Sequence, residues 1–204
     1  MVQGYGGIAS IATKYFKELF STSSPTRMEE VADLVPGKVT QEMNEQLTKE
    51  FQKEEIIQAV RNMHPKKALS PNGMSTIFYQ KYWDVIRDDV INTVLNVLNS
   101  NALVAALNQA NIALIPKINC PSKMSEFWPI SLCNVSYKIV SKVLANRLKP
   151  ILSTIVSENQ SVFVPSRLLI DNVPVAFEIM HYLKKKEGKE CHMVVKLDIS
   201  KAYD

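Results

Sequence analysis

Apolar residues recur at helical spacing through most of the first hundred residues, and this pattern limits the fold more than any other feature. Steps of three and four residues place such side chains along one face of a helix. The spacing is clear at residues 8–20, 54–63 and 75–99, and shorter helices are expected at 28–34 and 40–48. In the first of these stretches the apolar face consists of Ile8, Ile11, Ala12, Tyr15 and Leu19. The first half of the chain is therefore expected to be helical.

The second half combines strand and helix patterns. Residues 111–116 form a short apolar run closed by Pro116, which is typical of a strand, and residues 130–132 are its expected partner. Apolar and polar positions alternate over residues 191–198, which predicts a further strand. Helices are expected at residues 137–152 and 173–184. The fold class is α+β, mostly helical, with a small and incomplete sheet.

The helix expected at residues 137–152 is amphipathic. Lys138, Lys142 and Lys149 fall in one narrow sector of the helical wheel, opposite a sector of valine, leucine and isoleucine. Arg147 falls in the middle of the apolar sector, so its charge must either reach solvent along its aliphatic stem or find a buried partner. Pro150 either kinks this helix or ends it.

Composition excludes several classes of protein. A hydrophobic content of 46% is too high for a disordered chain, and six glycines among 204 residues exclude collagen. Three cysteines without a CxxC pair predict neither a disulfide framework nor a zinc site, and they fit a reducing compartment. No apolar run approaches the roughly 18 residues of a membrane span, and no secretory signal is recognisable. An intracellular protein is therefore expected.

Positive charge is concentrated in the second half. Residues 1–100 hold 11 basic and 12 acidic side chains, whereas residues 101–204 hold 13 and 8. Between Ile115 and Lys149 there are six basic residues and one acid, Glu126. This asymmetry indicates either a polyanionic partner or a solvated basic surface.

Several separated blocks of the sequence resemble the reverse transcriptases of non-LTR, LINE-type retroelements, in the family's order and spacing. The resemblance is to plant elements of this type and extends over residues 50–204, and more weakly over residues 1–50. The blocks are His64–Ala68, Pro71–Gly73, Phe78–Lys81, Ile112–Lys117, Glu126–Asn134, Tyr137–Leu148, Glu158–Arg167, Asp171–Asn172 and Leu197–Asp204.

The resemblance implies roles for individual residues. Asp198, in the segment LDISKAYD, is similar to a metal-binding aspartate of the polymerase, with the Ile199 carbonyl as a second oxygen ligand. Two Mg²⁺ ions in the intact parent enzyme bridge the attacking and leaving oxygens of nucleotidyl transfer. Tyr203 corresponds to the aromatic residue that contacts the incoming sugar, and Lys117 to the basic residue that meets the triphosphate.

The implied partners are an RNA template, a DNA primer and deoxynucleoside triphosphates. Template or primer phosphates are the expected ligands of Lys138, Lys142, Lys149 and Arg167. For the three lysines the alternative is a solubilising helix face. By resemblance the protein would be found in the nucleus or the cytoplasm.

The sequence departs from the family pattern at several positions. Trp128 occupies the place of an arginine that contacts the triphosphate, and an indole cannot supply a guanidinium fork. Asn72 replaces an aspartate in a Pro-Asp-Gly turn. Ser166 replaces the glycine of a Pro-Gly-Arg step, which is unfavourable if that position requires a positive φ. The aromatic-x-Asp-Asp motif that carries the second metal-binding carboxylate is absent from these 204 residues.

Taken together, these observations predict a fragment of an RNA-directed DNA polymerase. Residues 1–50 are expected to form a helical extension or linker, and residues 51–204 the fingers and first palm strand of a truncated domain. The enzymatic activity of this chain is uncertain: with one of the aspartate motifs missing, we expect the fragment to be inactive by itself and not to hold both ions fully. The alternative is a non-catalytic nucleic-acid-binding protein or a poorly folded retroelement remnant. The oligomeric state is left open.

Overall fold

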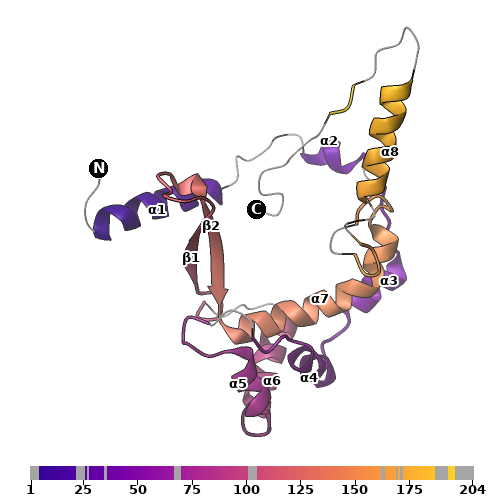
Figure 1. Ribbon diagram of the computed structural model, residues 1–204. Helices are drawn as coiled ribbons and strands as arrows, with labels where there is room; N and C mark the ends of the chain where they lie inside the picture. The colour runs from indigo at the N-terminus through magenta and orange to yellow at the C-terminus, as the bar shows by residue number, and fades with distance from the viewer. Residues whose placement is uncertain are drawn as a thin grey trace. The chain divides into compact units, whose positions relative to one another are not determined.

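The computed structural model describes residues 5–21, 26, 28–34, 36–66, 70–100, 105–161, 164–168, 170, 172–186 and 193–195 (Figure 1). The chain divides into two compact units. One comprises residues 38–155, and the other comprises residues 1–37 together with residues 156–204. Within the described residues the fold is mostly helical with one two-stranded antiparallel sheet, which confirms the α+β class.

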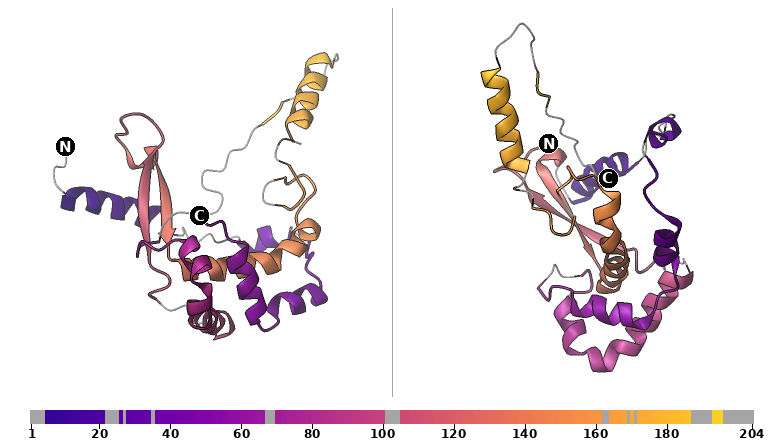
Figure 2. Two further views of the ribbon diagram at one scale, coloured as in Figure 1. Left: turned by 60° about the horizontal axis from the view of Figure 1, so that its bottom comes forward. Right: turned by 90° about the vertical axis from the view of Figure 1, so that its right-hand side faces the viewer.

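The unit of residues 38–155 is built on helices and a hairpin. Its elements are α3 (Gln41–Thr48), α4 (Lys53–Arg61), α5 (Thr76–Lys81), α6 (Trp83–Ser100), β1 (Ala110–Pro116), the 3₁₀ turn η1 (Met124–Glu126), β2 (Phe127–Cys133) and α7 (Val135–Ile155). Helices α4 and α6 lie against α7 (Figures 1 and 2). They bury a cluster around Ile56, Val94 and Ile139, each of which is completely inaccessible to solvent.

Side chains at the helix ends account for several helix boundaries. The Thr40 hydroxyl accepts the Met43 N–H at 3.3 Å and begins α3. The Gln80 side-chain amide donates to the carbonyl oxygens of Val60 and Met63, at 2.9 and 2.8 Å, and so satisfies the last turn of α4. The periodic stretch at residues 75–99 is divided into α5 and α6, because Tyr82 leaves the helical region with φ −101° and ψ 21°.

The turn at residues 70–74 has an asparagine where the family pattern has an aspartate, and its side chain contacts the turn. Gly73 has a φ of +76°, which glycine adopts at little cost. The Asn72 side-chain oxygen accepts the Met74 N–H at 3.1 Å and the Ser70 hydroxyl at 2.6 Å. The neutral amide oxygen thus adds two contacts to a turn that is also closed by the backbone hydrogen bonds from the Ser70 N–H to the Met74 carbonyl and from the Gly73 N–H to the Ser70 carbonyl, at 3.1 and 2.9 Å.

The two expected strands pair as predicted. β1 and β2 are antiparallel, with Ile115 opposite Trp128 and Ala113 opposite Ile130. The side chain of Asn134 then links the turn before β1 to the start of α7. Its amide donates to the Leu107 carbonyl at 2.9 Å, and its oxygen accepts the Tyr137 N–H at 2.9 Å in the first turn of α7.

Helix α7 differs from the expectation in two respects. It continues through Pro150 to Ile155, so the proline does not end the helix. Val140, Val143 and Ile151 are buried as expected, whereas Leu144 is 48% exposed. Leu144 lines an open groove of about 790 Å³ between α7, the end of α6 and the segment that connects α3 to α4. The apolar sector of α7 is thus wider than the surface that α4 and α6 cover.

The second unit contains, among its described residues, the helices α1 (Tyr5–Leu19), α2 (Met28–Ala32) and α8 (Asn172–Lys185). In α1 the ring of Phe16 is buried and contacts the rings of Tyr15 and Phe20, with centroids 5.2 and 6.0 Å apart. The large apolar side chains of α8, such as Phe177, are mostly exposed. Of the strand expected at residues 191–198, only residues 193–195 are described, and they have no regular secondary structure. None of the helices in the described part of the chain is long and apolar enough to cross a bilayer.

Candidate functional site

The end of the β-hairpin holds Lys117 in a defined position. Lys117 directly follows β1, and its N–H donates to the Glu126 carbonyl at 2.8 Å, which extends the pairing beyond the strand. Its ammonium donates to the Ser125 carbonyl at 2.9 Å. The same ammonium lies 4.3 Å from the centroid of the Trp128 ring, within range of a cation–π interaction.

The loop beyond Lys117 is closed by Glu126. Its carboxylate accepts the N–H groups of Ser122 and Lys123, at 2.6 and 3.0 Å. These backbone hydrogen bonds, that from Ser122 first, hold the pKa of Glu126 below its usual range because they favour the charged form. The carboxylate therefore stabilises the turn that presents the Ser125 carbonyl to Lys117.

The contact between Lys117 and Trp128 was missed from the sequence alone. In the hairpin register Trp128 faces Ile115, and Lys117 lies two residues further along the same face. The predicted pairing of residues 111–116 with 130–132 carried no register, and a shift of one residue moves a side chain to the opposite face, so that pairing alone did not bring Lys117 and Trp128 together. The sequence comparison indicated only that Trp128 lacks the guanidinium of the arginine found in the family pattern.

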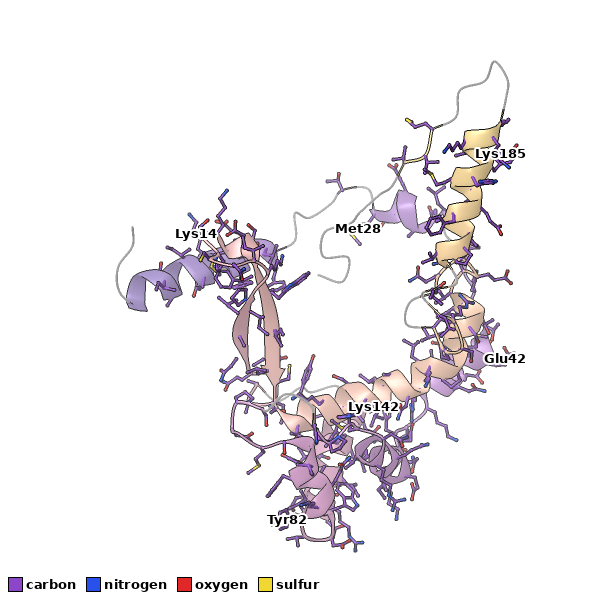
Figure 3. The ribbon with its side chains drawn as sticks, viewed as in Figure 1. Lys14, Met28, Glu42, Tyr82, Lys142 and Lys185 are labelled. Atoms are coloured by element: carbon purple, nitrogen blue, oxygen red, sulfur yellow. The ribbon has the colours of Figure 1, made fainter. Side chains whose placement is uncertain are left out.

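The three lysines of the basic sector lie on α7 in the same unit of the chain. Lys138 and Lys142 are half-buried and Lys149 is exposed. Lys142 lies midway along α7 (Figure 3). Spacings of four and seven residues bring these side chains to one side of the helix. The structure thus confirms the helix on which the basic sector depends, and its role in binding stays a prediction.

Of the two outcomes expected for Arg147, reaching solvent or finding a partner, the structure shows the second, with the partly buried Glu55 as the partner. Its Nε and Nη2 atoms donate to the two carboxylate oxygens of Glu55, at 2.6 and 2.8 Å. The arginine side chain is 12% exposed and the glutamate side chain 30%. The Arg147 hydrogen bond is the main cause that lowers the pKa of Glu55.

The remaining donors of Arg147 reach the segment between α3 and α4. They contact the carbonyl oxygens of Leu47 at 3.1 Å, Glu50 at 3.0 Å, and Lys49. The guanidinium carbon also lies 3.5 Å from the centroid of the Phe51 ring. Arg147 therefore fixes this connection to α7, and its role is structural.

Arg167 also makes contacts within its own unit. Its Nη1 atom donates to the Gln160 carbonyl at 2.8 Å and to the Ser157 carbonyl, so the guanidinium organises the turn after α7. The neighbouring Ser166 has a φ of +65°. This position therefore does adopt the left-handed conformation for which the family uses glycine.

Comparison with known proteins identifies the segment that contains these residues. Residues 115–204 match the family described as reverse transcriptase (RNA-dependent DNA polymerase). The second half of the chain is therefore similar to part of a reverse transcriptase domain. Lys117, Trp128, the basic sector of α7 and Arg167 all lie within the matched residues.

A curated relative extends the similarity beyond that domain segment. The chain is 29% identical over 195 residues to the "Transposon TX1 uncharacterized 149 kDa protein" of Xenopus laevis. The similarity covers 95% of this chain and 15% of the Xenopus protein, so the chain spans less than a sixth of its relative. Because nearly the whole chain aligns, the segment before residue 115 shares the likeness to a transposon protein.

Three of the site residues expected from the resemblance, Asp198, Ile199 and Tyr203, lie outside the described residues. A carboxylate and a backbone carbonyl are oxygen donors of the kind that Mg²⁺ prefers, so this donor set suits the metal in kind. Within the described part of the chain, no three histidine, cysteine or acidic side chains lie close enough together to hold a metal ion.

Proposed function

We propose that this chain provides the fingers and the first palm strand of a reverse transcriptase of a non-LTR retroelement. Residues 51–204 would form this part of the domain, preceded by a helical extension over residues 1–50. The observation that carries the proposal is the match of residues 115–204 to the reverse transcriptase family. The similarity to a transposon protein over nearly the whole chain supports the retroelement origin.

In this proposal the substrates are deoxynucleoside triphosphates, an RNA template and a DNA primer. Lys117 contacts the triphosphate, and the Ser125 carbonyl at 2.9 Å supports its position at the end of the hairpin. Tyr203 contacts the incoming sugar. Asp198 and the Ile199 carbonyl would hold Mg²⁺, and two such ions supply the charge stabilisation that phosphoryl transfer requires.

Lys138, Lys142 and Lys149 supply phosphate contacts along α7, and Arg167 adds a cationic group after that helix. Such contacts position a nucleic acid without reading its sequence. They also release counterions, so the affinity falls steeply with salt. Salt-sensitive binding distinguishes this role from a basic face that only keeps the protein in solution.

We expect the polypeptide of residues 1–204 to have no polymerase activity by itself. Two-metal transfer needs carboxylates from more than one segment, and the sequence contains no aromatic-x-Asp-Asp motif. Its one pair of adjacent aspartates, Asp88 and Asp89, is exposed within α6 and does not follow the motif. Primer extension with purified chain, template, nucleotides and Mg²⁺ is expected to give no product, and template-dependent synthesis would contradict the expectation.

Binding is tested separately from chemistry. A fluorescent template–primer is titrated with the chain at two salt concentrations, and with a variant in which Lys138, Lys142 and Lys149 are changed to Gln. We expect the triple variant to bind more weakly and to lower the salt slope by about 0.7–0.9 for each phosphate that is no longer neutralised. Lys184→Gln/Lys185→Gln/Lys186→Gln, at the end of α8 and directly after it, is the control with the same loss of three charges. An unchanged slope in the triple variant would show that the basic sector only solubilises the protein.

A further inference from the structure

The exposed indole of Trp128 lies beside a lysine ammonium at the end of the hairpin. Trp128 is 59% exposed, even though the Lys117 ammonium lies 4.3 Å from the centroid of its ring. Ile130, two residues further along β2 on the same face, is 39% exposed. Large exposed apolar groups gathered on one face are characteristic of binding surfaces.

Hydrogen bonds hold the two side chains at a fixed spacing. Trp128 faces Ile115 in the strand register, and the backbone of Lys117 pairs with Glu126 at 2.8 Å. The Ser125 carbonyl accepts one of the three N–H donors of the Lys117 ammonium. An ordered aromatic ring and an ordered cation are therefore presented together from one rigid hairpin.

The charge around the hairpin favours an anionic ligand. Six basic residues and one acid occur between Ile115 and Lys149. That acid is Glu126, whose carboxylate is occupied by the N–H groups of Ser122 and Lys123. A cationic ligand would be repelled by Lys117, and a purely apolar partner would have to bury its ammonium. A ligand with a flat aromatic group and an adjacent negative charge fits both the Trp128 ring and the Lys117 ammonium.

We propose that Trp128 and Lys117 form a recognition site for an unpaired nucleobase and its phosphate. The base stacks on the exposed part of the indole, and the ammonium contacts the phosphate, as in proteins that combine aromatic platforms with basic groups. This rests on the proposed function, because it uses the triphosphate contact assigned there to Lys117. The new part of the proposal concerns Trp128. Its indole cannot supply the guanidinium fork of an arginine, and it binds the base through its π face instead.

Fluorescence of Trp128 tests the proposal in the full chain. The protein has two tryptophans, so Trp83→Phe leaves Trp128 as the single emitter. Titrations use a deoxynucleoside triphosphate, inorganic tripolyphosphate, a single-stranded oligonucleotide and the corresponding duplex. We expect quenching by the nucleotide and the single strand, and weaker binding of tripolyphosphate, which has no base. Comparing the affinity for the deoxynucleoside triphosphate with that for the single-stranded oligonucleotide shows whether the base comes from a free nucleotide or from a strand.

Variants separate the stack from the phosphate contact. Trp128→Ala is expected to weaken nucleotide or single-strand binding, measured by anisotropy of a labelled ligand, by roughly 5- to 100-fold, the range for one base–aromatic stack. Its affinity for tripolyphosphate should be unchanged. Trp128→Phe should restore much of the loss. Ile112→Ala, an exposed residue on the opposite face of the hairpin, is the matched control. Circular dichroism confirms that each variant is folded.

Three results would overturn the inference. They are equal affinities for tripolyphosphate and nucleotide, no effect of Trp128→Ala on ligands that contain a base, or an equal loss of duplex binding in that variant. Lys117→Gln tests the proposed function independently, because loss of tripolyphosphate binding in this variant supports the triphosphate contact whether or not a base stacks. Unchanged tripolyphosphate binding in Lys117→Gln would instead argue against that contact.

Discussion

A serine at position 166 stores conformational strain in the turn after α7. Its φ of +65° lies in the left-handed region, which costs a residue with a Cβ atom about 1–2 kcal/mol. The sequence comparison with the Pro-Gly-Arg step of the family identified this position, and the structure confirms the positive φ. The neighbouring Arg167 supports the conformation through its hydrogen bond to the Gln160 carbonyl.

Replacement of this serine by glycine should therefore stabilise the protein. We expect Ser166→Gly to raise the free energy of unfolding by about 0.5–1 kcal/mol, since relief of strain exceeds the entropy that glycine loses on folding. Urea unfolding followed by circular dichroism measures the change. Ser141→Gly, in the middle of α7, is the contrasting variant and should destabilise by about 0.5 kcal/mol. A loss of stability in Ser166→Gly would show that the serine side chain compensates for its strain.

At the scale of elements, the sequence predicted local patterns better than the contacts between them. A short apolar run with a closing proline located the first strand of the hairpin. The helical wheel showed that Arg147 had either to reach solvent or to find a partner. The partner itself, Glu55, lies 92 residues away, and no local periodicity connects the two. The contact between Lys117 and Trp128 was missed because each residue was considered alone. The roles of Asp198 and Tyr203 come from the family resemblance, because a strand-end carboxylate and a tyrosine have no distinctive local pattern.

The Arg147–Glu55 pair connects α7 to α4, and its removal should be costly. We expect Arg147→Ala to lower the free energy of unfolding by about 3 kcal/mol, because it leaves a half-buried carboxylate and several carbonyl groups without their donor. Arg147→Lys should lower the free energy of unfolding by less than Arg147→Ala, because lysine keeps the positive charge. It should still cost stability, because lysine lacks the planar fork that contacts both carboxylate oxygens. Lys149→Ala, exposed on the same helix, is the control and should change stability by less than about 0.5 kcal/mol.

The same pair predicts a pH dependence with a defined sign. The pKa of Glu55 is lowered from 4.5, first by the Arg147 hydrogen bond, with the Gln52 N–H and the charges of Arg147 and Lys49 also contributing. The ion pair therefore stabilises the folded protein above pH 4.5. This stabilisation is lost as the pH falls through the pKa of Glu55 in the folded protein, which is lower than 4.5. The stability difference between wild type and Arg147→Ala should narrow between about pH 7 and pH 3 in chemical unfolding. A constant difference over this range would mean that Glu55 does not titrate with the pair.

At the scale of the whole molecule, the main cluster of buried apolar side chains in the described part of the chain lies within one continuous segment. Its fully buried residues, such as Ile56, Val94 and Ile139, come from α4, α6 and α7, and all lie between residues 38 and 155. The caps described for α3, α4 and α7 are supplied from the same segment. The Arg147 contacts to residues 47–55 are also internal to it. The unit thus contains both its apolar core and the partners of these polar groups.

A fragment of residues 38–155 should consequently fold by itself. A chain of this length can bury a sufficient core, and the core and cap contacts described above are all made within the segment. We expect it to unfold in one cooperative thermal transition, and Arg147→Ala to lower the midpoint of that transition as it does in the full chain. The fragment should also retain the Lys117–Trp128 pair, so the same nucleotide titrations apply to it. A broad, non-cooperative transition with strong binding of a hydrophobic dye would show that residues outside 38–155 are needed to complete the core.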